Sequence, residues 1–183
     1  MNKAIFLDRD GVINKIRYHH EIGIYSAKNL EEFVVLPKVK EAIAILKSLG
    51  YKIIVITNQP GIAFGYIKKE DMEEINTYMK EELGVDAVYV CPHHPDHSGE
   101  CECRKPKLGL FKKAAEENDI DFSESINIGD NVTDMLAGKR CKNNYLIGPK
   151  RLDIETIFEE YNIMPDKIFK SLYDAAKYIE LNS

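Results

Sequence analysis

Two hydrophobic patterns alternate along the chain. Short, almost continuous apolar runs are typical of β-strands covered on both faces, whereas apolar residues repeated every three or four positions are typical of amphipathic helices. The apolar runs cover residues 4–7, 53–56, 87–90, 126–128 and 145–147. The helical pattern covers residues about 37–50, 69–83, 108–118, 132–140 and 172–181.

The first helical stretch also carries boundary signals. Pro37 suits the first turn of a helix, and Gly50 can adopt the left-handed conformation that ends one. The alternation of strands and helices predicts an α/β fold: a doubly wound, mostly parallel sheet with helices on both faces. No repeat or linker divides the sequence, so we expect one domain spanning residues 1–183.

Composition and charge narrow the possible partners. The chain has 44% hydrophobic residues and a formal net charge of -5, without a long run of lysine and arginine. This balance argues against nucleic acid or a membrane surface as partner and leaves a small molecule. The sequence shows neither a membrane span nor a secretory signal. We therefore expect a cytoplasmic protein, and a monomer.

Polar and glycine residues follow four of the predicted strands. In chain order these clusters are DRDG, TNQPG, a Cys/His-rich loop ending in RKPK, and GDNVTD. In open α/β sheets, ligands bind outside the carboxyl ends of the strands, so we expect the four clusters to converge at one edge.

The residue types in these clusters suit phosphoryl transfer. Asp8 can attack phosphorus to form an aspartyl-phosphate, and Asp10 can act as general acid and base. Asp8 and Asp130 offer the hard oxygen ligands that Mg²⁺ prefers. The expected contacts to the phosphoryl group are the Thr57 hydroxyl, the Lys105 ammonium and backbone amide hydrogens of the sharp turn that Gly11 allows.

Taken together, DRDGVIN, VITNQPG, CRKPK and GDNVTD resemble the four motifs of the haloacid dehalogenase superfamily of phosphatases, over roughly the first 140 residues. The chain looks most similar to the D-glycero-D-manno-heptose 1,7-bisphosphate phosphatases, which in turn resemble the histidinol-phosphate phosphatases. The resemblance implies removal of the 7-phosphate, with Mg²⁺ held by Asp8, Asp130 and the backbone carbonyl of Asp10. It also places Arg104 on the substrate.

The stretch CPHHPDHSGECECRKPK predicts a second metal. Its two close Cys/His pairs fit tetrahedral zinc and resemble the zinc loop of these two phosphatase groups. The expected zinc ligands are Cys91, His93, Cys101 and Cys103. His94 and His97 are rival ligands, and disulfides are the alternative in a secreted protein. Zinc with four protein ligands has no open position, so we expect it to position Arg104 and Lys105 rather than to react.

Several roles stay open. Asp134 can bind the metal or act at a helix N-terminus. Asn58, Gln59 and the PGIAFG that follows them can contact substrate or form a turn. The spacing of the motifs leaves no room for a separate cap domain, so loops at about 14–30 and 91–103 should wall the site. The rival functions are a histidinol-phosphate phosphatase and a zinc-containing binding module without catalysis. The acidic charge argues against the binding module.

Overall fold

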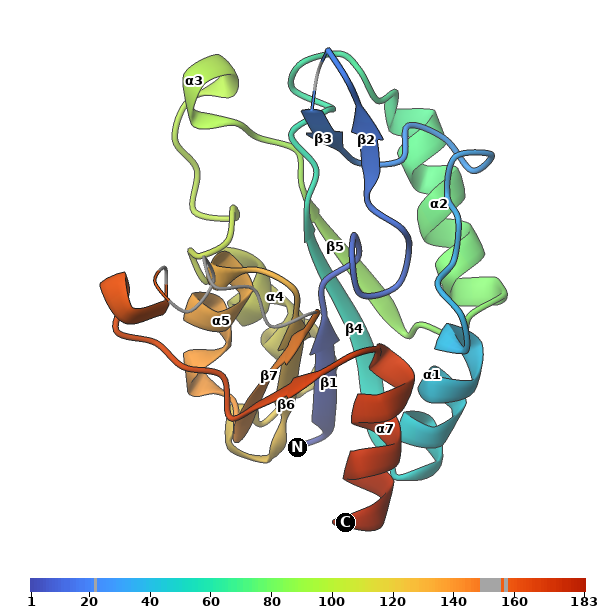
Figure 1. The fold of residues 1–183 in the computed structure, drawn as a ribbon, viewed down its shortest axis with the longest axis vertical. Helices are drawn as coiled ribbons and strands as arrows, with labels where there is room; N and C mark the ends of the chain where they lie inside the picture. The colour runs from blue at the N-terminus through green and yellow to red at the C-terminus, as the bar shows by residue number, and fades with distance from the viewer. Residues whose placement is uncertain (22, 149–155, 157) are drawn as a thin grey trace.

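A computed structural model describes residues 1–21, 23–148, 156 and 158–183. In this part of the chain the main feature is a six-stranded sheet in the order β5-β4-β1-β6-β7-β8, in which neighbouring strands are parallel (Figure 1). The strands are β1 (Lys3–Leu7), β4 (Tyr51–Asn58), β5 (Ala87–Cys91), β6 (Ile126–Gly129), β7 (Asn143–Ile147) and β8 (Lys167–Phe169). The expected α/β fold is confirmed.

Helices cover both faces of the sheet. They are α1 (Val39–Ser48), α2 (Lys69–Glu81), α3 (Pro95–Ser98), α4 (Gly109–Asn118), α5 (Val132–Ala137) and α7 (Leu172–Leu181), with 3₁₀ turns η1 (Phe122–Glu124) and η2 (Gly138–Arg140). Successive side chains of β1 point to opposite faces. Ile5 and Leu7 pack in the core formed with α1, α2 and α7, whereas Ala4 and Phe6 pack in the core formed with α4.

The five predicted strands all lie within observed strands, but some boundaries differ. Pro37 lies before α1 rather than in its first turn, because Lys38 takes a left-handed conformation (φ 60°) and the helix begins at Val39. Gly50 does adopt a positive φ of 82° after the helix.

The helix predicted for 132–140 ends at Ala137 and continues as η2. At this point a Cβ on Gly138 would lie 2.4 Å from Nδ2 of Asn127, so the chain approaches the sheet closely. Asn127 and Asn144 donate to the carbonyl oxygens of Asp134 and Met135, which ends the helix early.

Two further strands, β2 (Arg17–His19) and β3 (Gly23–Tyr25), form an antiparallel hairpin that was not predicted. The hairpin and the loop that carries α3 extend beyond the carboxyl ends of β1 and β4, in the upper part of Figure 1. Among the described residues, no helix has the length and apolar character needed to cross a membrane.

Candidate active site

A pocket of about 710 Å³ lies at the carboxyl edge of the sheet. All four polar clusters contribute to it, as expected from a parallel sheet. The contributing side chains are Asp8, Asp10, Thr57, Asn58, Arg104, Lys105, Asp130, Asn131, Thr133 and Asp134.

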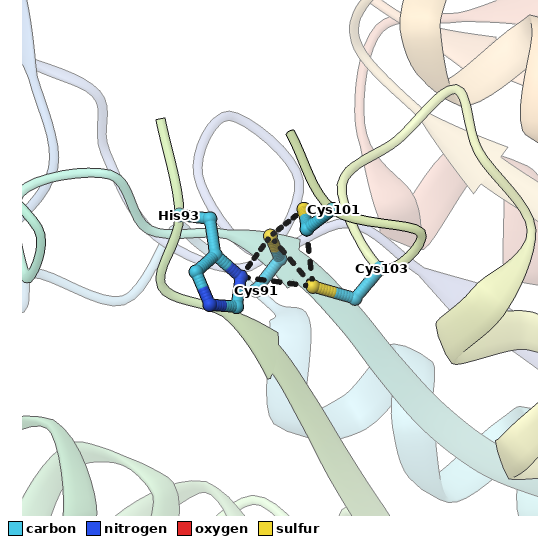
Figure 2. Close-up of side chains that lie close together, drawn as sticks. All are labelled: Cys91, His93, Cys101 and Cys103. Atoms are coloured by element: carbon cyan, nitrogen blue, oxygen red, sulfur yellow. Dashed lines mark hydrogen bonds between the residues drawn. The ribbon is translucent and has the colours of Figure 1, made fainter. Parts of the chain in front are cut away.

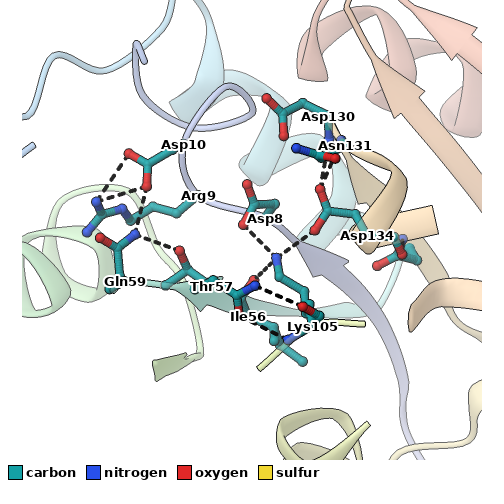
Figure 3. Close-up of polar contacts among 12 residues, drawn as sticks. Asp8, Arg9, Asp10, Ile56, Thr57, Gln59, Lys105, Asp130, Asn131 and Asp134 are labelled. Carbon is teal, nitrogen blue, oxygen red and sulfur yellow. Dashed lines mark hydrogen bonds and ion pairs between the residues drawn. The ribbon is translucent and has the colours of Figure 1, made fainter. Parts of the chain in front are cut away.

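Lys105 lies at the centre of this cluster. Its Nζ is 2.6 Å from Oδ1 of Asp8 and 2.7 Å from Oδ1 of Asp134, and it donates to the carbonyl oxygen of Ile56 (Figure 3). Burial alone would lower the pKa of Lys105, but the two carboxylates raise it above its ordinary value. Lys105 is therefore a fixed positive charge beside Asp8.

Three acids crowd together near this lysine. Burial raises the pKa of Asp8 to about 7, against the opposing effect of Lys105 and with added repulsion from Asp134. Burial raises the pKa of Asp130 to about 8, and the charges of Asp8 and Asp134 add to the shift. One oxygen from each of the three carboxyl groups lies within 4.8 Å of the others. This donor set fits a hard divalent cation, which would relieve the repulsion.

Asp134 has both of its oxygens engaged. While Oδ1 pairs with Lys105, Oδ2 accepts hydrogen bonds from the backbone N–H groups of Asp130 and Asn131 at 3.2 and 3.1 Å. With Asn131 it forms the capping box of α5. Of the two roles left open for Asp134, the geometry favours the one at the helix N-terminus.

Asp10 is surrounded by donors. Its carboxylate accepts hydrogen bonds from Arg9, Asn14, Ser26 and Gln59, of which the shortest, from Gln59, is 2.7 Å. Burial alone would raise the pKa of Asp10, but Arg9, Asn14 and Gln59 lower it. Arg9 is fully buried and was not singled out from the sequence. An arginine between two acids at the end of a buried strand is the signal that would have indicated it.

Gly11 allows the sharp turn that is expected after β1, but its own N–H is not offered to a ligand. Its N–H donates to the carbonyl oxygen of Asn14 at 2.8 Å, so it is engaged within the turn rather than offered to a ligand. The residue has φ 89°, and a Cβ here would lie 2.1 Å from Oδ2 of Asp130. Glycine is therefore required because Asp130 approaches the backbone after β1.

The residues at the carboxyl end of β4 and directly after it hold their neighbours in place. Gln59 donates to Oγ1 of Thr57 at 2.8 Å as well as to Asp10, and it does not line the pocket. Asn58 accepts from the backbone N–H of Lys105 at 3.0 Å and donates to its carbonyl oxygen at 3.2 Å. Asn58 and Thr57 do line the pocket.

The predicted zinc ligands come together at the end of β5 (Figure 2). The Sγ atoms of Cys91, Cys101 and Cys103 lie 3.1 to 3.7 Å apart, and Nδ1 of His93 is 3.2 Å from Sγ of Cys103. Zinc–sulfur bonds of about 2.3 Å in a tetrahedron would separate two sulfurs by about 3.8 Å. The cysteines form no disulfide. The residues present fit zinc.

The two rival histidines lie elsewhere. The rings of His94 and His97 pack against Phe64, with ring centres 4.8 and 5.1 Å from its own, and Phe64 stacks on Tyr66. Because Phe64 and Tyr66 line the pocket, the Cys/His loop supports a pocket wall without forming one.

The walls themselves differ in part from expectation. The segment expected at about 14–30 does form one wall, through Ile16, Ile24, Tyr25, Ser26 and Lys28. Ile22, in the same segment, lies outside the described residues. A further part of the lining comes from the loop at 60–67, whereas the segment 91–103, also expected to line the pocket, does not contribute.

Curated proteins of similar sequence are named as heptose-1,7-bisphosphate 7-phosphatases, some for the beta and some for the alpha anomer. The chain is 39% identical to the D-glycero-beta-D-manno-heptose-1,7-bisphosphate 7-phosphatase of Haemophilus influenzae, over 80% of this chain and 82% of that protein. It is 44% identical to the enzyme of the same name from Helicobacter pylori strain 26695, over 80% and 84%. A D-glycero-alpha-D-manno-heptose-1,7-bisphosphate 7-phosphatase from Campylobacter jejuni is 40% identical, over 79% and 81%.

A solved structure of a heptose bisphosphate phosphatase also resembles the chain. The D,D-heptose 1,7-bisphosphate phosphatase from B. bronchiseptica, complexed with magnesium and phosphate, superposes with a TM-score of 0.81 at 26% identity and 99% coverage of both chains. The profile of the haloacid dehalogenase-like hydrolases matches residues 6–142. With its acid cluster, fixed lysine and matching sequence, the chain belongs to the haloacid dehalogenase-like hydrolase family.

Proposed function

We propose that this protein is a Mg²⁺-dependent phosphatase that removes the 7-phosphate from D-glycero-D-manno-heptose 1,7-bisphosphate through an aspartyl-phosphate at Asp8. The observation that carries the proposal is the contact between Asp8 and the fixed cation Lys105, inside an acid cluster that lines the pocket. The names of the curated relatives support the substrate.

The reaction divides into two displacements. A carboxylate oxygen of Asp8 attacks the 7-phosphorus, the bond from phosphorus to the sugar oxygen breaks, and Asp10 gives that oxygen a proton. Asp10 then takes a proton from water, which attacks the phosphorus of the aspartyl-phosphate and releases inorganic phosphate. Lys105 and the hydroxyl of Thr57 hold the phosphoryl oxygens throughout.

Asp10 must carry a proton for the first step, although its donors favour the ionised form. A bound phosphate dianion places negative charge beside Asp10 and shifts its pKa upward. Ser26 and Gln59 keep the carboxyl group in one orientation in either state.

The acid cluster fits Mg²⁺, which Asp8, Asp130 and the backbone carbonyl of Asp10 would hold. When bound, Mg²⁺ neutralises charge on the phosphoryl oxygens and on the acids. Zinc would be held by Cys91, His93, Cys101 and Cys103, and it would brace the segment that leads into Arg104 and Lys105.

The charges that line the pocket favour a bisphosphate over histidinol phosphate. Arg104 lines it, with Nη1 held by the carbonyl oxygen of His93 at 3.2 Å. The carboxylates that line the pocket all belong to the Asp8, Asp10, Asp130 and Asp134 group, as far as the described residues show. A second phosphate would therefore meet positive charge, whereas the amine of histidinol phosphate would find no carboxylate partner beyond that group.

A substrate panel tests the proposal. In the presence of Mg²⁺, kcat/KM for heptose 1,7-bisphosphate, measured for both anomers, should exceed that for histidinol phosphate at least about tenfold, or 1.4 kcal/mol. Asp8→Asn should release no phosphate from either substrate. Equal or reversed efficiencies would overturn the substrate assignment, and an active Asp8→Asn variant would overturn the mechanism.

A further inference from the structure

We propose that Lys28 is a specificity-determining residue that binds the substrate phosphate that is not cleaved. This inference rests on the proposed function, because it names the partner of the second phosphate of a bisphosphate substrate.

The position of Lys28 is fixed relative to the reacting centre. It follows β3 and lines the pocket together with Tyr25 and Ser26. Oγ of Ser26 donates to Oδ2 of Asp10 at 3.0 Å, and the backbone N–H of Lys28 donates to Oε2 of Glu32 at 3.1 Å. The wall that carries Lys28 is thus attached to the proposed general acid.

The charge of Lys28 is available to a ligand. The cations that line the pocket, within the described ranges, are Lys28, Arg104 and Lys105. Lys105 is committed to Asp8 and Asp134, and one guanidinium nitrogen of Arg104 is engaged with a backbone carbonyl. Nζ of Lys28 lies 5.3 Å from the centre of the Tyr25 ring, and no ion pair connects it to a described carboxylate.

The chemistry of lysine suits a distal phosphate. An ammonium on a flexible stem is a point charge that forms charge-assisted hydrogen bonds without demanding one geometry. The two anomers of a heptose 1,7-bisphosphate present the 1-phosphate in different directions. Lys28 would therefore select for the presence of the second phosphate more than for the anomer.

Lys28→Met tests the inference against two substrates, heptose 1,7-bisphosphate and heptose 7-phosphate, which lacks the second phosphate. For the bisphosphate, kcat/KM should fall at least about tenfold, mainly through KM. For the monophosphate and for p-nitrophenyl phosphate it should stay within about twofold. Lys28→Arg should restore most of the loss. Lys15→Met, an exposed lysine outside the pocket lining, is the matched control and should change neither value.

The outcomes separate this inference from the proposed function. The role of Lys28 alone is overturned if the wild-type enzyme prefers the bisphosphate but Lys28→Met leaves kcat/KM unchanged. It is also overturned if Lys28→Met lowers kcat/KM equally for both substrates. A wild-type enzyme that does not prefer the bisphosphate over the monophosphate also overturns the role of Lys28, whereas the proposed function fails only if heptose 1,7-bisphosphate is hydrolysed no better than histidinol phosphate.

Discussion

Buried charges set the geometry of the site at the scale of single residues. Arg9 is fully buried, yet its Nη2 lies 3.0 Å from Oδ2 of Asp10, its Nη1 is 3.3 Å from Sδ of Met72, and it faces the ring of Phe33. A buried charge is tolerated only where it is paired in this way. The donors Asn14, Ser26 and Gln59 lie 4, 16 and 49 residues from Asp10, so the sequence motifs identified Asp10 without showing which side chains orient it.

Gly11 gives a residue-scale prediction about metal binding. Gly11→Ala places a Cβ where Oδ2 of Asp130 now lies, so the Mg²⁺ concentration for half-maximal activity should rise at least about tenfold. Gly23→Ala is the matched control, because Gly23 also has a positive φ (74°) but a Cβ there meets nothing within 4 Å. Magnesium titrations of both variants measure the effect, and an equal effect in both would attribute it to backbone strain instead.

At the scale of elements, buried apolar strands were predictable from the sequence, whereas the short, partly exposed strands β2, β3 and β8 were not. The apolar runs in β1, β4 and β6 are buried, so they can be recognised in the sequence. β8 has only three residues, and the β2–β3 hairpin is half exposed, so neither produces a hydrophobic pattern. The pocket wall that carries Ser26 and Lys28 was therefore expected only as a loop, without its hydrogen bonds to Asp10 and Glu32.

The Cys/His loop at residues 91–103 leads to a prediction about zinc content. Cys101→Ser should sharply lower a zinc content of one per chain, whereas His97→Ala should retain the zinc, because its ring packs on Phe64 and not on the sulfurs. Elemental analysis measures the content. KM should rise in Cys101→Ser, since the loop braces Arg104 and the Phe64 wall. A zinc-free protein with full activity would contradict this role.

Across the whole molecule, protonation, metal binding and stability are linked. In the metal-free protein Asp8 and Asp130 have pKa values of about 7 and about 8, above the ordinary value of 3.8. Between pH 3.8 and about pH 8, Asp8 and Asp130 hold protons in the folded state that the unfolded chain has lost. These two groups therefore make the free energy of unfolding fall as the pH rises through this range. Mg²⁺ binds the deprotonated acids and should reverse this loss of stability.

The increase in Tm produced by Mg²⁺ should therefore grow from about pH 6 to about pH 9. Asp130→Asn should lose most of this increase, since it removes a charged ligand from the cluster. The buffer contains no chelator, so that any zinc stays in place. A magnesium effect that is independent of pH, or unchanged in Asp130→Asn, would contradict the assignment of the acid cluster.

The covalent step at Asp8 is tested most directly by trapping it. Enzyme that is turning over heptose 1,7-bisphosphate with Mg²⁺ is quenched rapidly and treated with borohydride, which reduces an acyl phosphate to an alcohol. Peptide mass spectrometry should then find homoserine at position 8, only when substrate was present. An enzyme that releases phosphate at full rate while position 8 stays aspartate, or while the reduced residue lies elsewhere, would contradict the aspartyl-phosphate mechanism.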